Sequence, residues 1–560
     1  MKLAKLKIQN FRGLKGENNI IDFIDSNIIF LIGQNNVGKS TYLRAYEFFT
    51  NSSQKAATED FYNHNLNNSI IIEGWFIKDD DDIDDDDLKG KGKEKDAEWI
   101  SKWVGTDGFI KIKKEWKESN KTFEKFTFSP TSNDWVVNGF GGFDTLFSKY
   151  APTPIAISAM EDQSSLEEKV NKLIQEDFIK KVKDNYAIEY EKLINGIKDL
   201  QSKITGSEDV EKLNEELNTH FQKVFADLTL KIQASKDENI KLEDAFKKNH
   251  TVIVERTARK ETFLQNGHGV IRQALFNFLT FLKKDTSDAK KQYLILFEEP
   301  EVFLHPKIAF KLRESLYELA DDSPYQILCA THSPLMIDIS KPHSSLIRVV
   351  KEQNETTATF QVGKDIFGKD EEQKERIQMI NRFNPHICEA FYADKVLLVE
   401  GDTETIVYRD LLKRFYPNEE IFVLNTGSKN NIPFFQEILT KFQINHFVIH
   451  DSDVEKVTDK DGKERTNSAW TLNQNIWDKI ELANQLKTGL SRRYVHFTNF
   501  ETAHGIILSN GKDKPLKAYQ FVKEVKNEGN IPDCLKWLND IVGKQEILHD
   551  MNYVETNKKS

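Results

Sequence analysis

A glycine-rich segment near the start of the chain has the residue types and spacing of a phosphate-binding loop. Gly33 and Gly38 frame it, and Lys39 and Ser40 follow, which satisfies the pattern G-x-x-x-x-G-K-[ST]. In such a loop, consecutive backbone N–H groups surround phosphate oxygens, and the following helix adds the positive end of its dipole. We therefore expect Lys39 to reach the β- and γ-phosphates of ATP and the Ser40 hydroxyl to bind Mg²⁺. The expected nucleotide contacts are Gly33, Asn35, Asn36, Gly38, Lys39, Ser40 and Thr41.

A second segment supplies the carboxylates that a phosphate-binding loop needs. Residues 293–297 form an apolar run that predicts a buried strand, and Glu298 and Glu299 follow it directly. Ligands bind at the carboxyl ends of strands in open α/β sheets. We expect Glu298 to hold Mg²⁺ and Glu299 to polarise the attacking water. His332 follows the next predicted strand, at 325–330, and this order favours a role as a sensor of the γ-phosphate over a structural one.

Four acidic residues in the last third of the chain also follow predicted strands. Glu400 ends an apolar run at 395–399, and Glu404 lies on the first turn of the next predicted helix. Asp451 and Asp453 end a second run, and strand alternation turns both side chains to the same side. Converging carboxylates repel unless cations neutralise them, and oxygen ligands of this kind suit Mg²⁺ or Mn²⁺. Two such ions can stabilise the attacking and leaving oxygens in phosphodiester cleavage.

A short glycine turn lies between these acidic segments. Gly427, Ser428 and Lys429 follow a predicted strand at 421–424. We expect this turn to form a loop close to the metals. The alternative is a plain surface turn.

The elements that position these residues alternate between strands and helices, which predicts an α/β fold. The segment from 164 to 249 differs, because its apolar residues recur at helical spacing with Lys and Glu between them. It indicates long helices that serve either core packing or dimerisation. We expect the following domains: an ATPase domain at 1–350 with a helical insert at about 160–250, a linker at 351–390, and a second α/β domain at 391–560.

Length and composition set the broad class of protein. A chain of 560 residues is too long for one hydrophobic core, and its net charge of −11 confines any nucleic-acid contact to a local basic patch. Its three cysteines show no metal-ligand spacing and fit a reducing compartment. No apolar run predicts a signal peptide or a membrane span. We therefore expect a cytoplasmic protein with no membrane partner.

Taken together, these motifs resemble those of the ABC-type ATPases of DNA maintenance. More narrowly, they resemble the overcoming-lysogenisation-defect (OLD) family and the related AAA_15 and AAA_21 ATPases. The acidic group after residue 390 resembles a TOPRIM domain, which OLD nucleases share with topoisomerases and primases. The order of ATPase and then TOPRIM is that of OLD proteins. The segments that carry the ATPase resemblance are the phosphate-binding loop, 10–13, 298–301, 304–306 and 331–334.

The resemblance implies further site residues. An ABC signature loop would act across a nucleotide-sandwich dimer, and its best match contains Gly267 and Gly269, in a form that departs from Ser-Gly-Gly-Gln. The family pattern also contains a further acidic residue, matched by Glu501, and a late lysine that stabilises the scissile phosphate. Lys514 and Lys517 both match this lysine, and the choice between them stays open.

The implied fold is an ABC-type ATPase domain with a helical dimerisation insert, followed by a Rossmann-like TOPRIM nuclease domain. The implied function is an ATP-regulated, metal-dependent DNA endonuclease in anti-phage or foreign-DNA defence, like the Gabija nuclease subunit and retron-associated OLD effectors. The implied cofactors are ATP and Mg²⁺, with Mn²⁺ as an alternative in the TOPRIM site. The implied partners are DNA, further copies of the chain, and a companion defence protein such as a helicase, or retron nucleic acid.

Two other interpretations stay open. One is a non-catalytic, ATP-driven DNA-binding or repair mediator of the RecF type, and the other is a TOPRIM nuclease that cleaves RNA. The complete acidic set argues against the first, since a scaffold need not keep carboxylates that repel one another. Nothing in the chain reads a 2′-hydroxyl, so the sequence does not separate DNA from RNA.

Overall fold

The chain folds into two compact units in the computed structural model, residues 1–159 with 287–560 and residues 160–286. Of the second unit, the structure describes helix α5 (Ala187–Thr205) and an antiparallel pair, β9 (Ile253–Arg256) and β10 (Arg259–Thr262). Most of the expected helical insert therefore lies outside the described residues. No helix among the described residues is long and apolar enough to cross a membrane. The structure describes residues 1–78, 103–138, 150–159, 185–205, 292–302, 304–321, 324–339, 345–352, 354–362, 385–508, 513–543 and 548–558, with a few shorter stretches.

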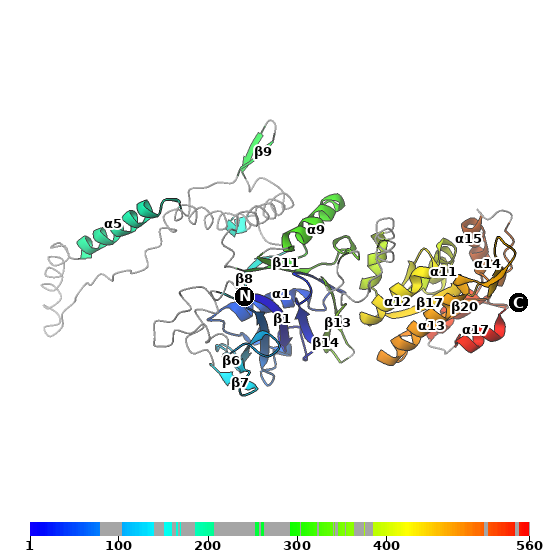
Figure 1. Cartoon of the computed structure of the whole chain (residues 1–560), viewed down its shortest axis with the longest axis horizontal. Coiled ribbons are helices and arrows are strands. Elements are labelled where there is room, and N and C mark those ends of the chain that lie inside the picture. The colour runs from blue at the N-terminus through cyan, green and yellow to red at the C-terminus, as the bar shows by residue number, and fades with distance from the viewer. Residues whose placement is uncertain are drawn as a thin grey trace. The chain divides into compact units, whose positions relative to one another are not determined.

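A six-stranded, mostly parallel sheet forms the centre of the first region of the larger unit, in the order β14-β13-β3-β12-β11-β8 (Figure 1). All five residues of β3 are buried, as expected for a strand covered on both faces. Ile29 and Leu31 point to the face covered by α1, while Phe30 contacts Tyr317 of α9 on the other face. The elements are β3 (Ile28–Ile32), α1 (Lys39–Thr50), β8 (Thr153–Ile157), β11 (Tyr293–Glu298), α9 (Pro306–Ala320), β12 (Tyr325–Ala330), η5 (Pro334–Met336), β13 (Leu346–Lys351) and β14 (Thr357–Gln361).

An antiparallel sheet packs against the same helix α1, in the order β2-β1-β4-β5-β6-β7. Buried and half-buried residues alternate along β4 and β5, so one face of this sheet joins the core around Tyr42 and Phe49 of α1. The elements are β1 (Lys2–Gln9), β2 (Asn19–Asp22), η1 (Thr58–Asp60), η2 (Tyr62–His64), β4 (Ile70–Ile77), β5 (Phe109–Trp116), β6 (Glu124–Ser129) and β7 (Asp134–Val137).

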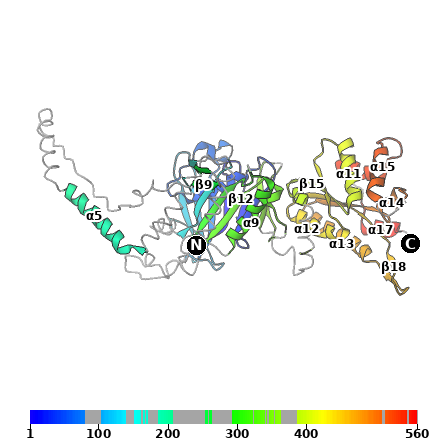
Figure 2. The same ribbon diagram turned by 90° about the horizontal axis from the view of Figure 1, so that it is seen from above.

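The last third of the chain forms a four-stranded parallel sheet in the order β16-β15-β17-β20. Figure 2 shows α11 and α15 on one side of it and α12 and α13 on the other. Because the strands are parallel, their carboxyl ends meet at one edge. The elements are η8 (Pro385–Tyr392), β15 (Lys395–Val399), α11 (Asp402–Phe415), β16 (Ile421–Asn425), η9 (Lys429–Asn431), α12 (Ile432–Lys441), β17 (Asn445–Asp451), β18 (Lys456–Thr458), β19 (Glu464–Thr466), α13 (Ser468–Leu486), β20 (Ser491–His496), α14 (Phe500–Ala503), α15 (Lys514–Glu524), α16 (Asp533–Gly543) and α17 (Met551–Asn557).

The α/β class predicted from the sequence is confirmed. Strand β14 lies in the first part of the stretch 351–390, which the sequence analysis assigns to a linker, and it pairs with β13. These residues therefore belong to the first sheet. Most of the remainder of that stretch, up to residue 384, lies outside the described residues.

Candidate functional site

The phosphate-binding loop joins β3 to α1, and its backbone geometry explains its glycines. Gly33 has a φ of +140°, and a Cβ there would lie 2.4 Å from the carbonyl oxygen of Val349 on the neighbouring strand. Gly38 has a φ of +99° and serves as the N-cap of α1. Asn36 also has a positive φ, of 65°. Ser40 and Thr41 lie in the first turn of α1, where backbone N–H groups favour an anion.

Lys39 is held inside this loop by main-chain acceptors. Its Nζ donates to the carbonyl oxygens of Gly33 at 2.9 Å and of Gln34 at 2.6 Å, and the residue is only 4% exposed. Burial lowers the pKa of Lys39 to about 8, although Glu299 and Glu301 act in the opposite direction. An anionic phosphate beside this ammonium would favour its charged form.

The neighbouring strands β12 and β11, which follow β3 on one side of the sheet, bring the predicted acid and histidine together. Glu299 follows β11 with a positive φ of 45°, and its backbone N–H donates to the carbonyl of Ala330 on β12. The Nε2 of His332 lies 3.5 Å from Oε1 of Glu299. Burial, and then the charge of Lys39, lower the pKa of His332, which favours a neutral ring. Glu298 ends β11 opposite Ala330.

Glu301 is a residue of this site to which the sequence analysis assigned no role. Its Oε1 accepts hydrogen bonds from the Thr331 hydroxyl at 2.7 Å and from the backbone N–H groups of His332 and Ser333 at 3.0 and 3.1 Å. Burial raises the pKa of Glu301. The side chain fixes the loop that carries His332. Its position two residues after Glu299 was the only available signal.

The expected signature loop cannot be placed beside this site. Gly267 and Gly269 lie outside the described residues. Their role across a dimer stays a prediction.

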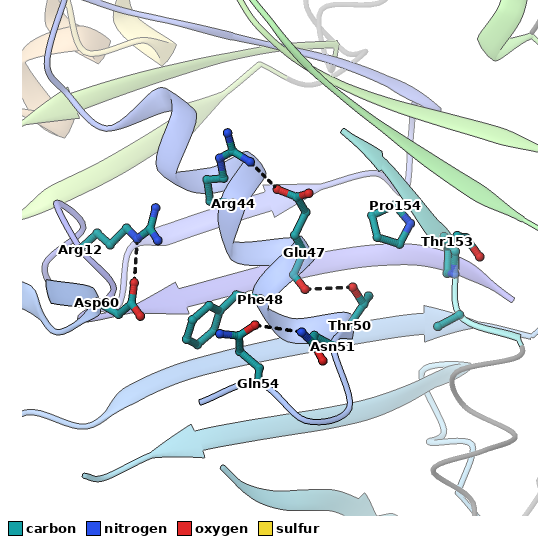
Figure 3. A pocket seen from close by; sticks show the side chains of 12 residues that line it. Arg12, Arg44, Glu47, Phe48, Thr50, Asn51, Gln54, Asp60, Thr153 and Pro154 are labelled. Atoms are coloured by element: carbon teal, nitrogen blue, oxygen red, sulfur yellow. Dashed lines mark hydrogen bonds and ion pairs between the residues drawn. The ribbon is translucent and has the colours of Figure 1, made fainter. Parts of the chain in front are cut away.

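A separate pocket of about 550 Å³ lies beside α1, and none of the residues of the phosphate-binding loop lines it (Figure 3). In Figure 3, Arg44 and Glu47 of α1 point toward one another, and Arg12 points toward Asp60. Both arginines are therefore paired with acids of the same pocket. We assign this pocket no role in the predicted binding and hydrolysis of ATP.

The acidic residues after position 390 line one pocket of about 400 Å³, which we call the acidic pocket. It lies at the carboxyl edge of the second sheet, so residues far apart in sequence are brought together by strand ends and helix starts. Glu404 and Glu501 are each 6% exposed. The charged residues that line the pocket are Glu400, Asp402, Glu404, Lys429, Asp451, Asp453, Glu501 and Lys514.

Burial and mutual repulsion raise the pKa of several of these carboxyls. Burial, followed by the charges of Glu400 and Glu404, raises the pKa of Asp451 to about 9. Burial raises the pKa of Glu400 to about 7, against the opposing effects of Lys429 and of the Asp451 N–H, which donates to Oε1 of Glu400 at 2.7 Å. The pKa of Glu404 is also raised by burial. Such shifts in one pocket are typical of a functional site.

Two lysines face these acids in different ways. Lys429, the last residue of the glycine turn, is 5% exposed, and its Nζ lies 2.8 Å from Oδ2 of Asp453. Lys514 has a 46% exposed side chain, and its Nζ lies 3.1 Å from Oε1 of Glu501. Lys517 is not among the residues that line the pocket. The structure therefore brings Lys514, and not Lys517, to the acids.

The donor set fits hard divalent cations, since every acidic ligand offers oxygen. Oδ1 of Asp451 is buried and has no hydrogen-bond partner among the described residues, as expected of an atom that can bind a cation. Among the described residues, no three His, Cys, Asp or Glu side chains are arranged to hold a metal ion as they stand. Asp453 and Glu501 are paired with lysines, so a cation would require these side chains to turn.

Asp394, directly before β15, connects the phosphate-binding loop to the second sheet. Its Oδ2 accepts a hydrogen bond of 2.6 Å from Nε2 of Gln34 within the phosphate-binding loop. Its Oδ1 accepts one of 3.0 Å from Arg348 of β13, whose guanidinium also donates to the carbonyl oxygens of Ala393 and Phe442. Strand β15 runs from this contact to Glu400 in the acidic pocket. We call Gln34, Arg348 and Asp394 the joint.

Two family models match the chain. Residues 1–337 match the model described as AAA ATPase domain, AAA_15, and residues 391–453 match the overcoming lysogenization defect protein-like TOPRIM domain. The first model covers the phosphate-binding loop and the acidic end of β11. The second covers five of the six acids that line the acidic pocket, all but Glu501.

Curated relatives match most of the chain. The chain is 28% identical to the Old nuclease of Escherichia phage P2 over 485 residues, which covers 81% of this chain and 77% of that protein. It is 23% identical to the endonuclease GajA of Bacillus cereus strain VD045 over 492 residues, which covers 82% and 77%. Among solved structures, the SMC head domain from Thermotoga maritima aligns with a TM-score of 0.32 and 14% identity over 65% of this chain and 99% of that one. A score this low supports no conclusion about function.

Proposed function

Because the chain belongs to the AAA_15 ATPase family and carries an OLD-like TOPRIM domain, we propose that it is an ATP-regulated, divalent-metal-dependent DNA endonuclease. The observation that carries this proposal is the acidic pocket, where carboxylates from separate segments meet two lysines at one sheet edge. The relatives named as nucleases share both regions with this chain. Metal dependence and the choice of DNA are parts of the proposal.

In the acidic pocket, five carboxylates would hold Mg²⁺ or Mn²⁺. Bound cations would lower the barrier to phosphodiester cleavage by stabilising charge on the attacking and leaving oxygens. Lys514 is exposed on the same side, and its ammonium can bind the scissile phosphate once Glu501 turns to a cation. The proposed ligands are Glu400, Glu404, Asp451, Asp453 and Glu501.

In the ATPase domain, Lys39 and the loop N–H groups would bind the phosphates of ATP, and Ser40 and Glu298 would hold Mg²⁺. Glu299 would orient the attacking water, with His332 beside it at 3.5 Å. Glu301 keeps the His332 backbone in place. A change at the phosphate-binding loop can reach the acidic pocket through the joint, because Gln34 contacts Asp394 directly.

The proposed biological role is defence against phage or other foreign DNA. It rests on the similarity to GajA and to a phage nuclease, together with the resemblance described from the sequence. The chemistry of the two sites is independent of this role. A homo-oligomer and a companion defence protein belong to the same proposal.

The test is cleavage of supercoiled plasmid by the full chain with Mg²⁺ or Mn²⁺, with and without ATP. Glu400→Gln keeps the side-chain shape and removes the charge, so we expect cleavage to fall by about 10³-fold, because a metal contributes several kcal/mol and 1.36 kcal/mol is tenfold. Glu437→Gln, which alters an acid paired with Lys479 outside the pocket, is the matched control. DNA retention without cleavage in every metal and nucleotide state would favour a mediator, and cleavage of RNA alone would reassign the substrate.

A further inference from the structure

Lys429 differs from every other lysine of the acidic pocket in its partners. Its Nζ donates to the carbonyl oxygen of Asp451 at 2.5 Å, to the carboxylate of Asp453 at 2.8 Å and to the carbonyl oxygen of Ser452 at 3.5 Å. These acceptors all belong to one turn, and the Ser452 carbonyl is the weakest of them, since it also accepts a hydrogen bond of 2.9 Å from Nδ2 of Asn473. Lys514 has a single carboxylate contact and an exposed amine.

Hydrogen bonds connect the loop that carries Lys429 to the end of β15. The backbone N–H and the hydroxyl of Thr426 both donate to the carbonyl of Val399, at 3.0 and 2.9 Å. Asn431 closes the loop by donating to the carbonyl of Thr426 at 2.8 Å. Gly427 supplies a φ of +73°, which few other residues adopt. The ammonium of Lys429 is therefore held at a fixed position beside Glu400, the residue after Val399.

The turn from Asp451 to Asp453 also forms backbone hydrogen bonds with the end of β20 and the residues that follow it. Ser452 donates its N–H to the carbonyl of His496 at 2.8 Å, and Asp453 donates its N–H to the carbonyl of Thr498 at 3.1 Å. Asp453 has a φ of 61°, a left-handed conformation that Asp adopts more readily than most other residues with a side chain. Lys429, which also lines the acidic pocket, contacts the same turn through its ammonium.

We propose that Lys429 is a positioning residue that holds the backbone of the Asp451–Asp453 turn in the conformation from which both carboxylates can bind a divalent cation, once the Asp453 side chain turns from the ammonium to the cation. This inference rests on the proposed function, because it deepens the role of the same pocket. Lys429 acts through the acids and does not itself contact the substrate, since its amine is buried and already has three acceptors. Its charge also offsets repulsion among Glu400, Asp451 and Asp453.

The test measures metal binding apart from cleavage. We use the full chain without nucleotide, titrate it with Mn²⁺ and follow free Mn²⁺ by electron paramagnetic resonance. Residues that orient metal ligands typically contribute about 10- to 100-fold to affinity, so Lys429→Met should weaken Mn²⁺ binding by about that factor. Lys514→Met should leave Mn²⁺ affinity within about twofold, because Lys514 is expected to act on the scissile phosphate, yet should lower plasmid cleavage at saturating Mn²⁺ by about 10²-fold.

Two further variants distinguish a specific effect on the metal ligands from a general loss of folding. Lys479→Met removes a lysine that forms a 2.8 Å ion pair with Glu437 outside the pocket, and it should bind Mn²⁺ like the wild type. Lys429→Gln keeps an amide NH₂ group that can donate to the carbonyls without the charge, and it should bind Mn²⁺ more tightly than Lys429→Met. Circular dichroism shows whether each variant is folded, and Lys429→Gln replaces Lys429→Met as the deciding variant if the latter does not fold.

Each other outcome has a distinct meaning. Unchanged Mn²⁺ affinity in Lys429→Met together with slower cleavage would overturn positioning and assign Lys429 to the substrate. Tighter Mn²⁺ binding in Lys429→Met would also overturn it, because the ammonium would then compete with the cation for its place. If the wild type itself binds no Mn²⁺, the proposed metal site fails and this inference fails with it. If the wild type binds Mn²⁺ but cuts no nucleic acid, only the proposed nuclease function fails.

Discussion

The phosphate-binding loop and the acidic pocket carry groups of opposite charge, and in both sites burial shifts the pKa of a key group toward its neutral form. At the loop, burial lowers the pKa of the ammonium of Lys39 to about 8, and at the pocket, burial raises the pKa of the carboxyl of Asp451 to about 9. Each group is held where its charged form is costly until a ligand of opposite charge arrives. The loop is therefore suited to phosphates and the pocket to cations.

The two sites differ in how their geometry is produced. The loop is one continuous segment, and its shape depends on backbone conformation, with positive φ angles at Gly33, Asn36 and Gly38. The pocket is assembled from the ends of several strands and the starts of helices, and its shape depends on side chains and on the ammonium of Lys429. We therefore expect variants at the loop to impair nucleotide binding, and with it the effect of ATP on cleavage, without changing metal binding, and variants at the pocket to impair metal binding and cleavage without changing ATP turnover.

The strongest test of this separation is Lys39→Ala. Removing the ammonium takes away the charge that faces the phosphates, and losing such a group in a preorganised site typically costs about 10²- to 10³-fold in turnover. We expect loss of ATP binding by calorimetry and a matching loss of phosphate release. Mn²⁺ binding at the acidic pocket should remain that of the wild type. Lys117→Ala, at an exposed lysine paired with Glu124, is the control, and normal ATP turnover in Lys39→Ala would refute the assignment of the loop.

The sequence predicted the loop more completely than the pocket, because the loop is one continuous segment and the pocket is assembled from separate segments. The order of Gly33, Gly38 and Lys39 is visible in nine consecutive residues, and the strand and helix that flank it have clear periodicity. The acids of the pocket could be suggested only from their positions after predicted strands and from the family resemblance. Their convergence depends on strand order, which periodicity does not determine.

Some functional contacts could not be predicted from the sequence at all. Lys429 binds main-chain carbonyl oxygens of a turn, and its partners have no side-chain pattern that a sequence displays. Glu301 likewise acts on backbone N–H groups. The bond from Gln34 to Asp394 joins residues that are 360 positions apart. The structure selects Lys514 over Lys517 for the pocket because only the former lies beside Glu501.

The joint tests whether the two sites communicate. Asp394→Ala removes the acceptor for both Gln34 and Arg348 and leaves every proposed ligand and catalytic group intact. We expect ATP turnover and plasmid cleavage, each measured alone, to stay within about threefold of the wild type, while the effect of ATP on cleavage is lost. Coupling between sites typically amounts to about 5- to 150-fold, so the loss should be measurable.

The matched control for the joint is Asp410→Ala, since Asp410 is also an acid paired with an arginine, Arg414, in the same domain. It should retain the effect of ATP on cleavage. If Asp394→Ala responds to ATP as the wild type does, communication between the sites does not pass through this contact. The phosphate-binding loop and the acidic pocket would then act independently of this contact.

A pH dependence of Mn²⁺ binding is expected at the acidic pocket and not at the phosphate-binding loop. Burial raises the pKa of Asp451 to about 9 and of Glu400 to about 7, so both carboxyls compete for protons with an incoming cation at neutral pH. Raising the pH from 6 to 8.5 weakens this competition, more completely at Glu400 than at Asp451, and Mn²⁺ affinity should rise by up to about tenfold per pH unit for each displaced proton. In the absence of metal, the free energy of unfolding changes with pH in the opposite direction. An unfolded aspartate has a pKa of about 3.9, so the unfolded chain loses these protons first and the free energy of unfolding falls as the pH rises toward 9. Asp451→Asn has no such proton to release and should flatten both dependences, whereas an Mn²⁺ affinity that is flat or falling with pH in the wild type would show that these carboxyls do not bind the cation.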